Sequence, residues 1–259
     1  MLVTKQMDQQ EIVINNKTYK PGQVLKYDVE EMREKNIFDD MRNANYKAVC
    51  FNFEEIPEKQ IVLLQDFGYG KGGIFWDGSY LLVKYFLDME TSWKNKEVSD
   101  PSKVKILELG AGTALPTIVL GTLGYSSIAT DLPSLVPFVE KNVYENLERG
   151  KNVDVKPLEW GKEEHMKNLT GEFDYIVCAE LVYYEEYFDA LIQTLKHYCT
   201  EKTKIIMTHR IRLPERTELF KSKLAEAFDI TFVDHSFVKK TIPNPNMIIL
   251  VATVKSKSE

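Results

Sequence analysis

The sequence VKILELGAGT at residues 104–113 joins an apolar run to an acid, Glu108, and a Gly-x-Gly turn. A second apolar run, SSIATD at residues 126–131, ends in Asp131. Two such runs separated by a helix-length connection are typical of a βαβ unit with parallel strands. Ligands bind beyond the carboxyl ends of parallel strands, where both acids lie. The two runs therefore predict a βαβ unit that binds a nucleotide-like cofactor.

Strands and helices alternate around this unit. Apolar runs predict strands at 104–109, 127–131, 153–158, 173–178 and 203–209, and helices between or after them at 114–122, 133–148, 185–199 and 214–226. Such alternation implies a parallel sheet with helices on both faces. The last two runs, 228–233 and 247–254, are joined by a linker with two prolines, in which we expect no helix. They predict a terminal antiparallel hairpin at the sheet edge.

The N-terminal part of the chain has a different pattern. Residues 11–19 predict a short hairpin, residues 28–44 are charged and favour helix, and two short strands follow at 48–53 and 61–65. We therefore divide the chain into a small β-containing N-terminal cap over residues 1–70 and a main α/β domain over residues 71–259.

Composition limits the function classes. The 259 residues carry a net charge of −6, which disfavours a general nucleic-acid binder. The three cysteines are far apart and the four histidines lack ligand spacing, so no zinc site, other metal site or disulfide framework is expected. The longest apolar run is too short to span a bilayer, and no signal or transit peptide is recognisable. We expect a cytoplasmic monomer without membrane contact, with a nuclear location left open.

The glycine turn lacks the features that bind phosphate. A dinucleotide fingerprint needs a third glycine, but Leu115 occupies that position and Pro116 follows it. No P-loop lysine is present either. Gly110 and Gly112 instead allow close approach of a cofactor that has a nucleoside but no phosphate. The alternative is a tight strand-to-helix turn that binds nothing.

Two acids and one tryptophan extend this site. Asp131 is placed to accept hydrogen bonds from both ribose hydroxyls, or alternatively to cap the helix that follows. Glu108 could bind an ammonium group of the cofactor, or pack beside the turn. Trp160 follows the third strand and could flank an adenine ring, although a lone tryptophan is more often part of a core.

The fourth strand leads into Ala179-Glu180-Leu181-Val182-Tyr183-Tyr184. Its carboxyl end should border the reacting centre, so Glu180 and Tyr183 are candidate catalytic residues. A carboxylate there can hydrogen-bond an incoming amine and orient its lone pair. The alternative is that Glu180 only caps the next helix.

Five parallel strands with a terminal hairpin form the architecture of class I S-adenosylmethionine-dependent methyltransferases, a Rossmann-like seven-stranded sheet. Over residues 60–254 the motifs resemble those of methyltransferase family 16, the seven-β-strand protein-lysine methyltransferases, including the methyltransferase-like 21 group. The similar segments are GIFWDG at 73–78, ELGAGT at 108–113, TDL at 130–132, LEWG at 158–161, AELVYY at 179–184 and RIR at 210–212.

This resemblance implies S-adenosyl-L-methionine as cofactor and a cytosolic protein substrate such as a chaperone, an AAA ATPase or a translation elongation factor. It implies a cofactor pocket lined by Trp76, Glu108, Gly110, Gly112, Thr113, Asp131, Trp160 and Ala179. The family motif D-x-x-Y falls on Glu180 and Tyr183. Here the acid is glutamate, whose extra methylene shifts the carboxylate.

The predicted reaction is in-line methyl transfer to a lysine ε-amine. The enzyme mainly supplies proximity and alignment, and aromatic walls from Trp76, Tyr183 and Tyr184 would favour the neutral amine. Glu180 would position the amine or accept its proton. The alternatives are a small-molecule N-methyltransferase, a nucleic-acid methyltransferase and a non-catalytic binding module. An Asn/Asp-Pro-Pro-aromatic signature of nucleic-acid enzymes is missing after the fourth strand.

Overall fold

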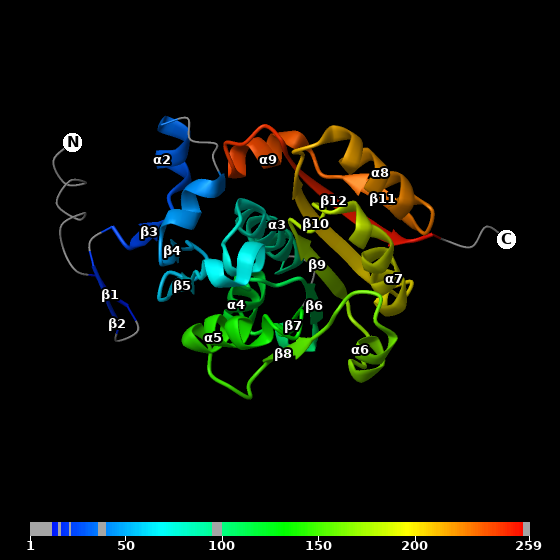
Figure 1. Cartoon of the computed structure of the whole chain (residues 1–259), viewed down its shortest axis with the longest axis horizontal. Helices are drawn as coiled ribbons and strands as arrows, with labels where there is room; N and C mark the ends of the chain where they lie inside the picture. Colours follow the sequence, from blue (N-terminus) through cyan, green and yellow to red (C-terminus); the bar gives the residue numbers. More distant parts are fainter. Residues whose placement is uncertain (1–11, 15–16, 21, 36–39, 95–99, 256–259) are drawn as a thin grey trace.

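The computed structural model describes residues 12–14, 17–20, 22–35, 40–94 and 100–255. A seven-stranded sheet forms its centre, in the order β11-β12-β10-β9-β6-β7-β8 (Figure 1). Its strands are β6 Lys105–Leu109, β7 Ser126–Asp131, β8 Val153–Pro157, β9 Tyr175–Ala179, β10 Lys204–Arg210, β11 Phe228–Phe232 and β12 Met247–Val254. The five strands β6 to β10 run parallel, and β12 lies antiparallel between β10 and β11. The predicted fold class is confirmed.

Helices cover both faces of this sheet. One face carries α3 Asp77–Lys94, α4 Leu115–Thr122, α5 Val136–Asn146 and α9 His235–Thr241. The other carries α6 Glu163–Asn168, α7 Phe188–Tyr198 and α8 Pro214–Ala225. Strand β9 shows why both faces are apolar: Tyr175 and Val177 pack toward α3, whereas Ile176 and Cys178 pack toward α7. Because side chains alternate along a strand, a doubly covered strand is apolar throughout.

One predicted connection was wrong. A helix, α9, lies between β11 and β12, where we expected only a linker. Asp234 caps its start by accepting a hydrogen bond from the Ser236 N–H at 3.0 Å. Val238 and Ile242 are buried against α3, so tertiary packing stabilises this short helix. The two prolines follow the helix and do not interrupt it.

The N-terminal cap consists of two small sheets. The hairpin of β1 Ile12–Ile14 and β2 Lys17–Tyr19 is antiparallel, as predicted. A second sheet has the order β3-β4-β5, from Val24–Lys26, Ala48–Asn52 and Gln60–Leu64. The short strand β3 was not predicted. Helix α2, Val29–Glu34, and the 3-10 turns η1, Asp40–Asn45, and η2, Phe67–Gly73, complete this part.

The cap shares its core with the main domain. Two asparagines on α5, one helical turn apart, bind the edge of β5: Asn142 exchanges hydrogen bonds with the Leu64 backbone, and Asn146 does so with the Val62 backbone. The apolar side chains of β4 and β5 join one cluster with those of α4 and α5. The boundary at residue 70 therefore marks a change of sequence pattern within a continuous core.

Candidate active site

The predicted site residues come together at the carboxyl edge of the parallel strands. Glu108 lies near the end of β6, Asp131 ends β7, and Ala179 ends β9. The registers Leu109 with Thr130 and Leu109 with Cys178 align these three strand ends. The residues of the glycine turn, the segment after β9 and the segment after β10 therefore face the same edge.

The glycine turn is tightly enclosed. Gly110 and Gly112 have φ values of 60° and 53°, which glycine adopts without strain. A Cβ at Gly110 would lie 2.6 Å from Leu181 Cδ2 and 3.1 Å from Trp160 Cζ2. A Cβ at Gly112 would lie 3.0 Å from the carbonyl oxygen of Gly72. Both glycines are thus required by conformation and by close packing.

Asp131 binds this turn directly. Its Oδ2 accepts the Gly112 N–H at 2.8 Å and its Oδ1 accepts the Leu132 N–H at 2.8 Å. The alternative role as cap of α5 is wrong, because Leu135 is the N-cap of that helix. Burial raises the pKa of the Asp131 carboxyl, and the two N–H donors partly oppose this. A carboxylate has about four acceptor sites, so two remain for other donors.

Glu108 is 2% exposed, and its Oε2 accepts the Thr117 N–H at 3.0 Å in the first turn of α4. Burial raises the pKa of this carboxyl to about 8. Among the described residues, no basic side chain forms an ion pair with it. An arriving ammonium group would satisfy this buried acid, which fits the predicted cofactor.

Three further predicted cofactor residues lie around the turn. Thr113 is buried and Ala179 is half-buried. Trp160 is half-buried and borders Gly110; the Gly161 N–H next to it donates to Thr194 Oγ1 at 2.9 Å, which holds the segment on α7. This group of residues combines a glycine turn, carboxylates and an aromatic side chain, which is the chemistry that a nucleoside with an ammonium group requires.

Glu180 occupies an unusual backbone position. Its φ is 59°, in the left-handed region that non-glycine residues rarely adopt and that is common at functional sites. It is 7% exposed. A Cβ at Gly78 would lie 2.6 Å from Glu180 Cγ, so glycine at the start of α3 makes room for this side chain.

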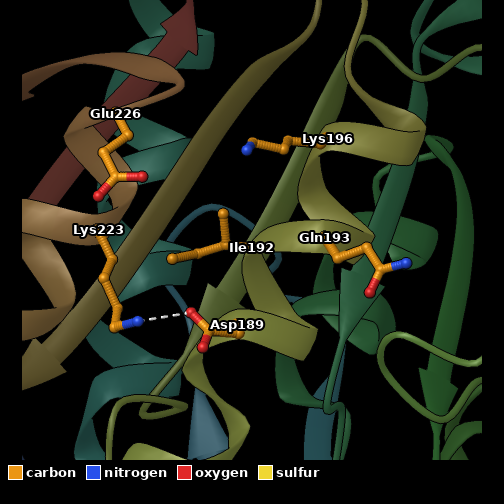
Figure 2. A pocket seen from close by; sticks show the side chains of 6 residues that line it. All are labelled: Asp189, Ile192, Gln193, Lys196, Lys223 and Glu226. Carbon is orange, nitrogen blue, oxygen red and sulfur yellow. Dashed lines mark hydrogen bonds and ion pairs between the residues drawn. The ribbon is translucent and has the colours of Figure 1, made fainter.

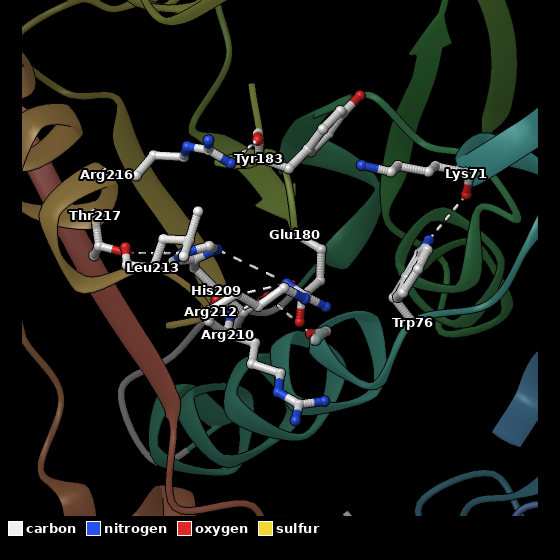
Figure 3. A network of polar contacts seen from close by, with 12 residues as sticks. Lys71, Trp76, Glu180, Tyr183, His209, Arg210, Arg212, Leu213, Arg216 and Thr217 are labelled. Atoms are coloured by element: carbon white, nitrogen blue, oxygen red, sulfur yellow. Dashed lines mark hydrogen bonds and ion pairs between the residues drawn. The ribbon is translucent and has the colours of Figure 1, made fainter. Parts of the chain in front are cut away.

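A polar group surrounds Glu180 (Figure 3). Glu180 Oε2 accepts Arg212 Nη1 at 2.8 Å and the Arg210 N–H at 3.3 Å. His209 Nδ1 lies 4.0 Å from the same oxygen, and burial with the nearby charge of Arg212 lowers the His209 pKa to about 4. Residue types alone did not identify Arg212 or His209. The segment RIR, which begins at the last residue of β10 and continues at the same sheet edge, was the available signal for Arg212.

Trp76 lies beside this polar group, as its expected role in the aromatic wall of the acceptor site requires, and its place in the cofactor pocket stays a prediction. Its Nε1 donates to the Lys71 carbonyl at 2.9 Å, and the Arg212 guanidinium lies 5.5 Å from its ring centroid. Lys71 places its ammonium 4.6 Å from the ring centroid of Tyr183. Burial, followed by the charge of Asp131, raises the pKa of Tyr183. Tyr183 therefore links the cofactor residues to the Glu180 group.

A separate cleft of about 250 Å³ lies between α7 and α8 (Figure 2). Its lining includes Asp189 and Lys223, which form an ion pair at 2.7 Å, and buried Ile192. None of the predicted site residues lines it. Within the described residues, no group of His, Cys, Asp and Glu could hold a metal, and no helix is both long and apolar enough for a bilayer.

Comparison with known proteins is consistent with this geometry. A family described as lysine methyltransferase matches residues 55–227. Protein N-lysine methyltransferase METTL21A of Danio rerio is 34% identical over 183 residues, covering 70% of this chain and 79% of that protein. EEF1A lysine methyltransferase 3 of Mus musculus is 29% identical over 194 residues, covering 74% and 77%. Alignments with other matched relatives cover 54% to 65% of their length.

Among solved structures, the glycopeptide N-methyltransferase MtfA complexed with S-adenosyl-L-methionine aligns with a TM-score of 0.49 at 12% identity, covering 69% of this chain and 94% of that one. The assignment does not depend on that weak likeness. It depends on the family match over residues 55–227 and on the relatives named as protein-lysine methyltransferases. The chain belongs to the lysine methyltransferase family, and it is an S-adenosylmethionine-dependent protein-lysine methyltransferase.

Proposed function

We propose that the target is a lysine on the surface of a folded protein, with a translation elongation factor as the first candidate class. The observation that carries this proposal is that exposed apolar side chains lie in η2 and in the segments that follow β7, β9 and β10 at the site's edge of the sheet: Phe67, Tyr69, Leu132, Tyr184, Tyr187 and Leu213. Apolar surface gathered around a site is typical of protein docking. The name of the EEF1A relative supports the elongation factor, and chaperones and AAA ATPases remain the other candidates.

The residues of the cofactor pocket have distinct proposed roles. Asp131 binds the ribose hydroxyls with the acceptor sites that its two backbone donors leave. Gly110 and Gly112 admit the methionine part, Glu108 binds its ammonium, and Trp160 flanks the adenine. Thr113 and Ala179 complete the walls.

When bound, S-adenosylmethionine supplies an activated methyl group. The chain must bring a neutral amine to it, and deprotonating a lysine near neutral pH costs about 4–5 kcal/mol. Arg212 compensates the charge of Glu180, so Glu180 can hydrogen-bond the amine without strongly favouring its charged form. The contacts from Arg210 and Arg212 hold the carboxylate in one place, which supports a positioning role.

Tyr183 and Tyr184 form the aromatic side of the proposed acceptor site. Their ring centroids lie 4.9 Å apart with the planes at 66°. The carbonyl oxygen of Tyr183 accepts Arg216 Nη1 at 2.7 Å, which anchors the loop after β9 to α8. We propose that the target lysine enters between these rings and the Glu180 group. The cytoplasmic location and the monomeric state stay predictions.

The test is transfer of labelled methyl from S-adenosylmethionine into a cell lysate and into purified elongation factor 1-alpha, chaperone and AAA ATPase. We expect one discrete protein band that maps to methyl-lysine. Asp131→Ala should abolish it, whereas Asp154→Ala, a matched aspartate on β8 paired with Lys156, should retain it. Label confined to small molecules or nucleic acid would overturn the proposal.

A further inference from the structure

Lys71 places its own amine in the proposed acceptor site (Figure 3). Its Nζ lies 4.6 Å from the ring centroid of Tyr183 and 4.2 Å from that of Tyr184. Cation–π attraction favours this position over open solvent. In the part of the chain that the structure describes, no carboxylate forms an ion pair with Nζ. The aromatic rings are therefore the groups that hold this ammonium.

The backbone around Lys71 is fixed against the cofactor pocket. The Lys71 carbonyl accepts Trp76 Nε1 at 2.9 Å, and the Asp66 N–H donates to the Gly73 carbonyl at 2.9 Å. The next residue, Gly72, packs its carbonyl against Gly112. A Cβ at Gly72 would lie 2.1 Å from Leu135 Cδ2, so this segment also packs closely against the start of α5. Lys71 is therefore the direct sequence neighbour of a residue that contacts the glycine turn.

The amine lies beside the two tyrosines of the segment that follows β9. Tyr183 contacts the Lys71 ammonium, and the charge of Asp131 contributes to the raised pKa of the same tyrosine. Figure 3 shows the Lys71 side chain extending toward Tyr183, in the same view as the Glu180 group. A target lysine in the proposed acceptor site would meet the same two aromatic rings.

We propose that Lys71 is a self-methylation site, modified in cis by the same active site; this inference rests on the proposed function. Lys71 Nζ first loses a proton to water. Its lone pair then forms a bond to the methyl carbon while the carbon–sulfur bond breaks, and that electron pair stays on sulfur. The products are methylated Lys71, S-adenosylhomocysteine and one proton. The methylated amine keeps its positive charge and its attraction to the rings, so it continues to compete with an incoming lysine.

The purified full chain is incubated with labelled S-adenosylmethionine and no other protein, then digested for peptide mass spectrometry. We expect label on Lys71, no label there in Lys71→Arg, and unchanged label in Lys103→Arg, a control lysine whose side chain is 80% exposed. The fraction methylated at a given time should not change on dilution, because the reaction is intramolecular. Purification of a chain already methylated at Lys71 would also support the proposal.

A parallel reaction contains lysate. Label in a lysate protein with an unmodified Lys71 would overturn self-methylation and leave the proposed function intact. The absence of label from both Lys71 and the lysate proteins would overturn self-methylation and the proposed function together. Label on other lysines of the chain, or a Lys71 signal that falls on dilution, would overturn the cis reaction.

A second measurement needs no turnover. Amine acylation is followed residue by residue in the presence of S-adenosylhomocysteine. Lys71 should react about fivefold more slowly than Lys103, and Tyr184→Ala should remove most of that protection. Equal acylation of Lys71 and Lys103 in the wild-type chain would overturn the placement of Lys71 between the rings.

Discussion

Replacing Glu108 by glutamine should remove a pH-dependent destabilisation of the folded chain. Burial raises the pKa of this carboxyl from 4.5 to about 8. An acid whose pKa rises on folding binds more protons in the folded state than in the unfolded state between those two values. Its effect on stability is therefore neutral below the unfolded pKa. It becomes increasingly unfavourable as pH rises toward the folded pKa.

Between about pH 5 and about pH 7, linkage gives a loss of about 2–3 kcal/mol of unfolding free energy for the wild type relative to Glu108→Gln. Glutamine is nearly isosteric, and its amide oxygen can still accept the Thr117 N–H, so the comparison isolates the charge. The assay is urea denaturation of both proteins at both pH values, with equal m-values as a condition. The reasoning would be refuted if the unfolding free energies of the wild type and Glu108→Gln differed by the same amount at both pH values.

The same carboxyl should couple cofactor binding to proton release. Near neutral pH it is mostly protonated, and an ammonium arriving beside it favours the ionised form. The calorimetric binding enthalpy of S-adenosylmethionine should therefore depend on the ionisation enthalpy of the buffer. That dependence should vanish in Glu108→Gln and persist in Glu164→Gln, an exposed control on α6.

Three further substitutions separate positioning from stability. Gly78→Ala places a Cβ 2.6 Å from Glu180 Cγ, so kcat should fall at least about tenfold, while the cofactor Kd from calorimetry stays within about twofold. Arg212→Met removes the cation at 2.8 Å from Glu180; kcat/KM should fall about tenfold or more, and Arg212→Lys should restore part of it in steady-state kinetics. Asn146→Ala leaves both polar groups of Val62 without their side-chain partner, so the unfolding free energy should fall by about 1–3 kcal/mol in urea denaturation, with cofactor affinity retained.

The parallel sheet was predictable because its signals are local. Apolar runs of strand length alternate with helical segments, and the right-handed crossover rule leaves few ways to arrange them. Short elements were less predictable: β3 has three residues, and within α9 only Val238 is buried, with Ile242 following at its C-cap. Elements this short depend on tertiary contacts more than on their own sequence.

The candidate cofactor pocket was predictable for a related reason. Glycine at positive φ and an acid at a strand end are local requirements, and parallel strands bring their carboxyl ends to one edge. Gly112 and Asp131, 19 residues apart, meet at 2.8 Å as that rule implies. The location of Trp76 beside Arg212 was not predictable, because it depends on how α3 and the segment after β10 approach each other.

The amino-acid pattern alone thus specified the sheet, its glycine turn and the acids that border it, since each depends on neighbours in sequence or on a general rule of parallel strands. Tertiary structure decided which side chains surround the acceptor amine. The contacts between Lys71 and Tyr183 and between Glu180 and Arg212 join separate loops, and their geometry depends on the packing of the whole edge. Pair contacts of this kind leave no periodic trace in the sequence, because a single side chain on each loop suffices to make them.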